Sequence, residues 1–586
     1  MRVALSIIAC LVLVVPVTAT DYYLDSRDGS DESAGTSQAQ AWASLDRLAE
    51  VELQPGDSVS LRRGCTYRGR LRLQGSGREG APVRIGAWGE GHRPEILGSV
   101  LVQGWEQAGG EVYRAAVPEE LFVGQRNVFS VFEYDGPIPV RLSRDDAPPT
   151  ERGHFHFDTE TLHLSVITTD GAPPAEHRLE VPVIEQLMDL RDWRWLDIED
   201  LSLLFGNCRH LGFRGCTDVT IRNCSSLFVG QYGNPNILIL DDSERVEVLD
   251  CFLYESINSG IYISSGSHHC RVAGCTIVKC ASNDGVTCHS GGRDEQGVRQ
   301  GLTGDHCIIE DNVIGLCPEE SIDITSGDYH VVRGNICYGN GNPGIIIGHD
   351  SDHVTVERNI SFGNQGGIYV GGQPEEGSRG HNRVIRNLCY DNTYPGIEVL
   401  GINDTLVLGN TIVNSRERVN LRINSESSGT VLRNNIIATL EPTIPHMLVH
   451  FIRGTPESVT ADMSHNLLYH AADVRKRDVF FPAGRLIRTE DGGFTPQGFL
   501  ARYLIGEATI VGEPGFRSVE DGSFALSEDS PAVDAGTDVD LPYAGEAPDI
   551  GWWEVGGEND VPRYPPALID GEADDEAEIL RLWGKG

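Results

Sequence analysis

The sequence predicts an all-β chain wound into a right-handed parallel β-helix, a solenoid whose short strands stack coil upon coil. Apolar residues alternate with other residues in short segments that end in polar bends, which is typical of strands with one buried face. An Asn also recurs at one bend, at steps of 23, 24, 28, 23 and 25 residues through Asn312, Asn335, Asn359, Asn387, Asn410 and Asn435. Such irregular steps do not fit helical repeats, so we expect coils about 4.8 Å apart with like residues in ladders.

The composition narrows the range of partners. The 586 residues include 47 Lys and Arg against 86 Asp and Glu, which gives a formal net charge of −39. This balance argues against a nucleic-acid partner, because binding a phosphate backbone requires a basic surface. No segment after the N-terminal region is apolar enough to cross a bilayer, so we expect no membrane span beyond that region.

The 14 Cys would suggest a disulfide framework in a secreted protein. Their spacing instead favours buried free thiols stacked in the core, with disulfides as the alternative. Cys224, Cys251 and Cys275 occupy the same place in successive repeats, as do Cys270 and Cys307. No CxxC spacing occurs, and we expect no metal cluster.

The chain divides into five segments. Residues 1–20 are interpreted as a secretory signal, because Arg2 is followed by an apolar run and small residues suited to cleavage; a single membrane anchor is the alternative. We therefore expect a secreted monomer, extracellular or periplasmic. The sequence then predicts an N-terminal cap with the first coils over 21–100, a small β insertion over 101–185, the β-helix core over 186–470, and C-terminal coils with a tail over 471–586.

The core resembles a known group of proteins. Residues 186–470 are similar to the right-handed β-helix proteins of the pectin-lyase-like superfamily, which includes polygalacturonases, polysaccharide lyases and alginate epimerases. The stretches 530–536 and 548–553 resemble the tail of many secreted bacterial β-helix proteins. Residues 186–470 and these two stretches together make up about half of the chain, and the resemblance implies a polysaccharide or oligosaccharide substrate. It does not fix the reaction, because this fold hosts several chemistries.

Alignment of successive strands predicts a groove that suits a sugar chain. One outward column holds Tyr262, Thr287, Asp323, Tyr369, Glu398 and Arg422, and the next holds His289 and Thr325. Glu398 and Arg422 are interpreted as a cross-strand ion pair. Arg293 and Arg299, from the long insertion 291–305, and His349 are further candidates for contact with the substrate.

Glycoside hydrolysis is the favoured chemistry, because it requires two carboxyl groups. Asp284 and Glu320 lie one coil apart at the bend before the groove, with Glu319 and Asp323 as alternates and His289 to orient substrate or a carboxylate. The resemblance to polygalacturonases supports this pair: Asn283-Asp284-Gly285 matches their N-T-D segment, and Glu319-Glu320 matches their D-D segment. Asn342-Pro343-Gly344 matches their G-H-G segment without its His, and no basic residue matches their R-I-K segment, so galacturonate is not supported as the substrate.

Two other functions remain open. Elimination or C5 epimerisation of a uronate requires a base and a positive charge that neutralises the carboxylate. His289 matches the His of the D-P-H segment in alginate epimerases, but Asp284 and Glu320 stand where those enzymes have Tyr and Arg. The hydrolase needs no cofactor, whereas this second chemistry could use Ca²⁺ held by Asp284, Glu320 and Asp323. The third function is a non-catalytic glycan-binding β-helix, with Tyr262 and Tyr369 as platforms.

Overall fold

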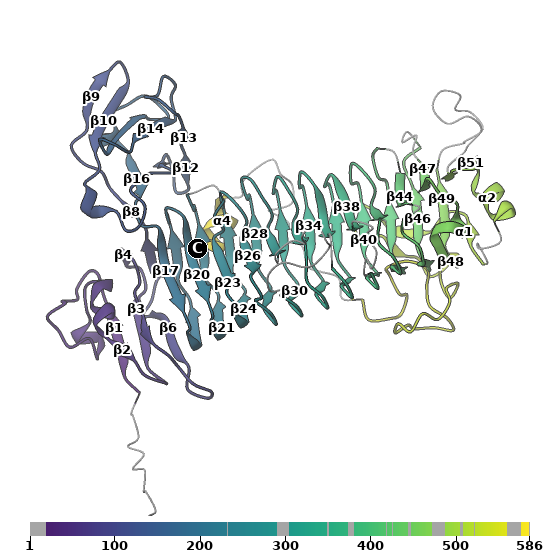
Figure 1. Cartoon of the computed structure of the whole chain (residues 1–586), viewed down its shortest axis with the longest axis horizontal. Coiled ribbons are helices and arrows are strands. Elements are labelled where there is room, and N and C mark those ends of the chain that lie inside the picture. The colour runs from purple at the N-terminus through teal and green to yellow at the C-terminus, as the bar shows by residue number, and fades with distance from the viewer. Residues whose placement is uncertain are drawn as a thin grey trace, which may run out of the picture.

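The computed structural model describes residues 19–584 apart from 231–232, 290–303, 349–350, 373–379, 418, 425, 443–446, 472–486, 504–507, 521 and 560–575. Within these residues the chain forms a β-solenoid of three long, mainly parallel sheets, which confirms the predicted fold class. Figure 1 shows the coils following one another along the long axis of the molecule. The predicted signal lies almost wholly outside the described residues.

From β17 to β49, each coil contributes one strand to each of the three sheets. The first sheet runs from β1 (Asp21–Leu24) to β48 (Thr460–Ser464), and the third from β4 (Thr66–Arg68) to β52 (Ile510–Val511). The remaining sheet, which we call the site sheet, consists of β17 (Gln186–Arg191), β20 (Arg209–Arg214), β23 (Ile237–Leu240), β26 (Ile261–Ser264), β29 (Val286–His289), β32 (Ile322–Ile324), β35 (Pro343–Ile347), β38 (Gly366–Gly371), β41 (Ile397–Leu400), β44 (Val419–Asn424), β47 (Met447–Ile452), β50 (Ile487–Thr489) and β51 (Gly492–Phe494).

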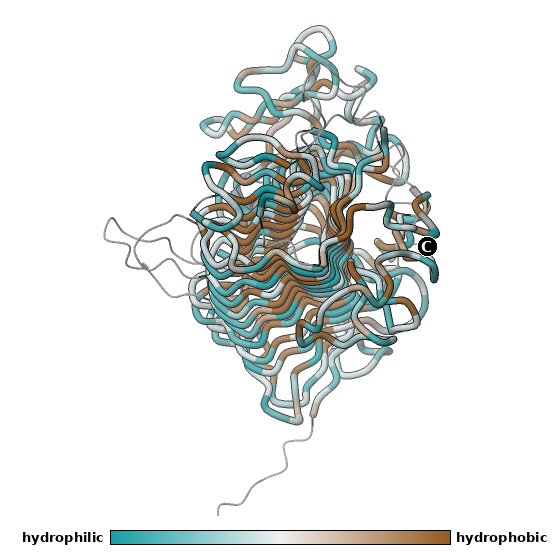
Figure 2. Tube along the Cα trace, turned by 90° about the vertical axis from the view of Figure 1, so that its right-hand side faces the viewer, coloured by the Kyte–Doolittle hydropathy of each residue, from teal (hydrophilic) through white to brown (hydrophobic). Residues whose placement is uncertain are grey.

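Apolar ladders fill the interior of the solenoid. In the site sheet, one buried column consists of Ile261, Val286, Ile322, Ile345, Ile368, Ile397 and Leu421, which pair in register from coil to coil. Figure 2, which looks along the solenoid, shows hydrophobic stripes continuing from coil to coil. Every second residue of these strands is apolar because it is buried in one of these continuous columns.

The recurring Asn forms a buried hydrogen-bonded ladder. The Asn312 Nδ2 atom donates to Asn335 Oδ1 at 2.9 Å, and the same bond repeats at 2.9–3.0 Å through Asn359, Asn387, Asn410, Asn435 and Asn466. Asn335 Nδ2 also donates to a backbone carbonyl of the preceding coil, that of Ile309, at 2.9 Å. The ladder confirms the predicted repeat and satisfies polar groups that would otherwise be buried without partners.

The 13 Cys of the described residues are buried and free, which confirms the prediction of stacked thiols over disulfides for this part of the chain. One grouping was not predicted from the spacing. Cys288, Cys307 and His330 bring potential ligand atoms within 4.8 Å of one another in the core. These three residues are far apart in the sequence and meet on neighbouring coils, so their spacing along the chain could not reveal this possible set of metal ligands.

Strands between residues 99 and 182 form two small, mainly antiparallel sheets beside the N-terminal coils, as Figure 1 shows. They run from β8 (Ser99–Val100) to β16 (Arg178–Pro182). A bidentate ion pair ties this unit to the solenoid: Arg68 Nη1 and Nη2 donate to the two Glu180 carboxylate oxygens at 2.8 and 2.9 Å. Glu180 is buried, so both of its oxygens require such partners.

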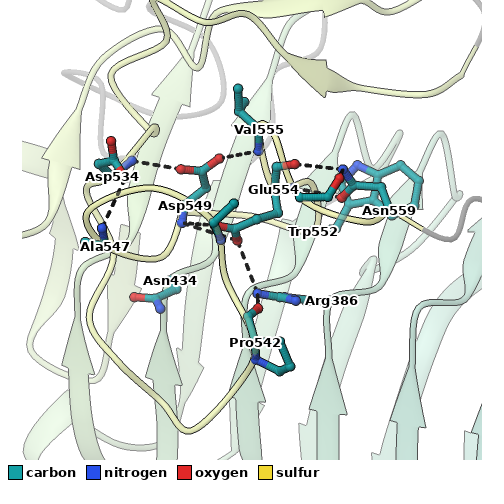
Figure 3. A network of polar contacts seen from close by, with 12 residues as sticks. Arg386, Asn434, Asp534, Pro542, Ala547, Asp549, Trp552, Glu554, Val555 and Asn559 are labelled. Carbon is teal, nitrogen blue, oxygen red and sulfur yellow. Dashed lines mark hydrogen bonds and ion pairs between the residues drawn. The ribbon is translucent and has the colours of Figure 1, made fainter.

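The C-terminal segment packs back along the solenoid. Arg386 on one coil donates to Pro542 O at 2.6 Å and pairs with Glu554, while Asp549 accepts from Val555 N at 2.7 Å, in the network of Figure 3. The helix α4 (Glu576–Trp583) buries Trp583 near the N-terminal coils. The other α-helices within the described residues are α1 (Pro456–Val459) and α2 (Pro496–Arg502). No helix among the described residues is both long and apolar enough to span a bilayer.

Candidate active site

One outward column of the site sheet brings the predicted groove residues into line. Strand register places them on successive coils in the order Tyr262, Thr287, Asp323, Ile346, Tyr369, Glu398 and Arg422, as the sequence alignment predicted. Six coil steps of about 4.8 Å make this column about 29 Å long. A column of that length can contact several sugar rings of one chain.

The column continues into a basic end that sequence reasoning missed. His450 lies beside Arg422, and Arg488 lies beside His450. Burial and the neighbouring Arg488 and Arg422 lower the pKa of His450 to about 4. The alternation in Leu448-Val449-His450-Phe451 could have revealed the first of these residues. The groove therefore has a carboxyl cluster at one end and the cations Arg422 and Arg488 at the other, with His450 uncharged between them at neutral pH.

Asp284 lies at the acidic end, at the bend before β29, and is only 2% exposed. Its Oδ1 accepts from the backbone N–H of Glu320 at 3.1 Å, and its Oδ2 accepts from the Thr287 hydroxyl at 2.8 Å. Thr287 is also buried and lies 3.2 Å from the Ser259 hydroxyl. Burial raises the pKa of Asp284 against the opposing effect of these hydrogen bonds.

Glu320 lies one coil further on, before β32, and is 7% exposed. Its carboxyl group is hydrogen-bonded to that of Asp284. Burial and this contact with Asp284, together with the charges of Asp323 and Glu319, raise the pKa of Glu320 to about 9. Because Asp284 receives the two protein donors that stabilise an anion, the proton shared by the pair resides on Glu320 at neutral pH.

Two more carboxyl groups complete the cluster. Asp323 lies on the outward face of β32, where Thr325 Oγ1 donates to its Oδ2 at 2.5 Å. Burial and the charge of Asp284 raise the pKa of Asp323 to about 7. Burial and the same charge raise the pKa of Glu319. Glu320 and Asp323 therefore differ in proton affinity, which is the arrangement that separates acid and base roles.

Tyr262 and His289 flank the carboxyl cluster on its N-terminal side. Their ring centroids lie 6.2 Å apart with the planes tilted by 39°. Both side chains are half-buried and border the groove between β26 and β29. Burial raises the pKa of Tyr262, and the charges of Asp323 and Asp284 add to the increase, so its hydroxyl is a hydrogen-bond donor at neutral pH.

A pocket of about 200 Å³ lies further along the same face. Tyr369, Glu398 and Arg422 line it, together with Tyr394 and Pro395. Arg422 forms the predicted cross-strand ion pair with Glu398, which is 8% exposed. The combination of aromatic rings with a fixed ion pair suits a sugar ring, which needs an apolar platform and polar contacts at its edge.

Three of the predicted contact residues, Arg293, Arg299 and His349, lie outside the described residues. Among the described ones, ligand atoms of Asp284, Glu319 and Glu320 lie within 4.8 Å of one another. The prediction of a Ca²⁺ site named Asp323 in place of Glu319. Oxygen ligands in such a group suit a hard divalent cation, and they equally suit a proton held between carboxylates.

Comparison with known proteins supports the fold. Residues 236–378 match the family model described as the right-handed beta helix region. A lacto-N-biosidase of Bifidobacterium longum subsp. longum is 36% identical over 107 residues, which is 17% of this chain and 6% of that protein. The chain thus spans a small fraction of the length of this curated relative.

Solved structures with a similar course of the chain act on several sugars. A mannuronic-acid-specific polysaccharide family 6 lyase from the human gut microbiota aligns with a TM-score of 0.42 and 12% identity, over 78% of this chain and 89% of its own. The GH136 lacto-N-biosidase from Eubacterium ramulus aligns with a TM-score of 0.38 and 15% identity, over 78% of this chain and 67% of its own.

Proposed function

We propose that this chain is a secreted enzyme that cleaves a polysaccharide or oligosaccharide by hydrolysis of a glycosidic bond. The observation that carries the proposal is the hydrogen-bonded Asp284–Glu320 pair at the acidic end of the groove. A carboxyl group that stays protonated at neutral pH can protonate the leaving oxygen of a sugar. Glu320 is the general acid in this scheme.

Asp323 is the second carboxyl group of the proposed reaction. It faces outward on β32, and its pKa of about 7 leaves it ionised in mildly alkaline solution. In that state it can activate water or attack the anomeric carbon. The expectation that Asp284 is itself one of the two reacting groups is revised: both of its oxygens accept from protein donors and it is almost fully buried. Asp284 is therefore a positioning residue that keeps the proton on Glu320.

The rest of the groove binds the sugar chain. Tyr262, Tyr369 and the Glu398–Arg422 pair contact rings on either side of the reacting bond, with His289 and Thr325 beside the carboxyl cluster. A long, shallow face along a solenoid suits an extended ligand. The name of the sequence relative, lacto-N-biosidase, adds oligosaccharides that contain lacto-N-biose to the substrates worth testing.

The test is a digestion panel of plant and algal polysaccharides and of lacto-N-biose oligosaccharides. Each digest is assayed for new reducing ends and for the ultraviolet absorbance of an unsaturated uronate. Reducing ends without absorbance are expected from the native protein, and Glu320→Gln is expected to lower their rate at least 1,000-fold, within the range of a lost general acid and its positioning. Cleavage at the parent rate by Glu320→Gln contradicts the assignment.

Elimination or epimerisation of a uronate is the second candidate, and the grouped oxygens of Asp284, Glu319 and Glu320 favour it if they hold Ca²⁺. The positive charge would then offset the substrate carboxylate. Absorbance that rises with product and disappears with a chelator would support this reaction. Products that change only in their C5 configuration would support the epimerase.

A further inference from the structure

A ladder of stacked rings lines a bend on a different side of the coils. His269, His306, Tyr329, His353 and His381 occupy the same bend of five successive coils, two residues before a strand of the first sheet. Their ring centroids lie 4.8–5.0 Å apart and their planes within 26° of parallel. We call these five residues the ring ladder.

Backbone conformation fixes each member of the ring ladder. All five have φ between 53° and 60°, a left-handed conformation that is uncommon outside Gly and Asn. The backbone N–H groups of the first four donate to the next coil, for example from Tyr329 N to Asp352 O at 3.0 Å. The rings consequently stack because the solenoid repeats one bend, and four of the five rings are imidazoles.

A second ladder, of carboxylates, runs beside the first. Asp305, Asp328 and Asp352 each directly precede a ring residue. Asp328 N donates to Asp305 Oδ1 at 2.9 Å, and Asp352 N donates to Asp328 Oδ1 at 3.2 Å. These bonds orient the carboxylates of Asp305 and Asp328. Asp305 and Asp352 place carboxylate oxygens next to the His residues that follow them in the sequence.

The two ladders converge at Asp352. Its Oδ1 lies 3.0 Å from His353 Nδ1 and 3.2 Å from His381 Nδ1. The three atoms lie within 4.8 Å of one another, Asp352 is buried, and both imidazoles are exposed. Metal–ligand bonds of about 2.1 Å place neighbouring ligand atoms about 3.0 Å apart at a right angle and about 3.4 Å apart at a tetrahedral angle. Both observed O–N distances lie in that interval.

We propose that Asp352, His353 and His381 form a surface site for a divalent first-row transition-metal ion such as Zn²⁺. Two imidazoles with one carboxylate favour Zn²⁺, Cu²⁺ or Ni²⁺ over Ca²⁺ and Mg²⁺, which prefer oxygen ligands alone. In the metal-free protein the Nδ1–H of each neutral imidazole donates to Asp352. On metal binding, each ring changes tautomer through exchange with water: its one proton leaves Nδ1 and resides on Nε2, so that the Nδ1 lone pair binds the ion and no net proton is released. Each Nε2–H remains outside this ligand set, and water fills the open positions.

The site is tested by calorimetric titration of tag-free, chelator-treated protein with Zn²⁺ near neutral pH in the presence of excess Ca²⁺ and Mg²⁺. His353→Gln and His381→Gln are each expected to bind one equivalent fewer than the native protein, or to bind it at least 10-fold more weakly. His163→Gln is the matched control, because His163 is a half-buried imidazole of the small β insertion whose Nδ1 lies 2.8 Å from a backbone oxygen.

His269→Gln, at the other end of the ring ladder, is expected to keep the equivalent that the other two variants lose. This comparison separates the proposed site from other groups of His, Cys and carboxylates in the chain. An unchanged titration in His353→Gln and His381→Gln overturns the proposal, as does the absence of tight Zn²⁺ binding by the native protein. Loss of the equivalent in the His163→Gln control also overturns it, because the ion would then lie elsewhere.

Discussion

Replacing Glu320 by Gln is expected to stabilise the protein in alkaline solution while removing activity. In the folded chain this buried carboxyl group has a pKa of about 9 against an ordinary value of 4.5. A carboxyl group with a raised pKa contributes its full stability below the unfolded value. That contribution is lost as the pH rises toward the folded value, because the unfolded chain can release the proton first.

The magnitude follows from the distance between the two values. At about pH 8 the folded group holds a proton against a gap of about 3.5 pH units, which corresponds to at most about 4.8 kcal/mol at 1.36 kcal/mol per unit. Solvent contact and relaxation around the Asp284–Glu320 pair screen part of this energy, so we expect about 2 kcal/mol. Gln has the shape of protonated Glu, can donate to Asp284, and carries no charge at any pH.

The assay compares melting temperatures of the native protein, Glu320→Gln and the control Glu90→Gln from about pH 4 to pH 9. An unfolding entropy of about 2.1 cal/mol/K per residue gives about 1.2 kcal/mol/K for the chain, so 2 kcal/mol raises the midpoint by about 2 °C. The rise should vanish near pH 4.5. Glu90 lies exposed in a bend, so Glu90→Gln is the control for the removal of one surface carboxyl group. An equal or lower midpoint for Glu320→Gln at about pH 8 would refute the reasoning.

Three further predictions concern the same groove. Activity should rise through about pH 7 as Asp323 ionises and fall above about pH 9 as Glu320 loses its proton, giving a bell-shaped profile of kcat/KM; a rate still rising above pH 9 contradicts it. Asp284→Asn should move the alkaline limb of the kcat/KM profile down by at least one pH unit, because it removes the negative charge that holds the proton on Glu320. An alkaline limb at the same pH, with kcat/KM lowered at least 1,000-fold, would instead mark Asp284 as a reacting group. Arg422→Met should lower the free energy of unfolding by about 2 kcal/mol, because it leaves Glu398 buried without its cation, and adding Glu398→Gln should recover most of the loss in chemical denaturation; no recovery would mean that packing dominates.

The register of the strands that form the groove could be predicted from the sequence alone. Alternation at period two leaves one choice of inward residues, and the recurring Asn fixes where each coil begins, so Asp323, Tyr369 and Glu398 could be placed on one face. The buried free thiols could be predicted for the same reason, since the repeat stacks like residues. Both inferences depend on local patterns that the fold repeats without change.

Contacts made at bends could not be predicted in this way. The buried carboxylate of Asp284 accepts a hydrogen bond from a backbone N–H of the next coil. Asp352 and His381 lie 29 residues apart, on two successive bends, and the length of chain between successive bends varies along the solenoid. Arg488, on β50, could not be placed for a different reason: it follows the regular part of the repeat. Period-two alternation does not describe bends, so their contacts appear only once the coils are stacked in three dimensions.

The same stacking that stabilises this fold also creates its proposed chemistry. A solenoid places residues of successive coils about 4.8 Å apart, which benefits Ile packed on Ile or Asn bonded to Asn. Two carboxyl groups brought together in this way cannot both ionise without strong repulsion, so one of them must keep a proton. The apolar and Asn ladders on either side supply the stability that keeps Asp284 and Glu320 together. A repeat that tolerates this one unfavourable contact therefore contains a carboxylic acid at neutral pH, which is the group that a glycosidic oxygen requires in order to leave.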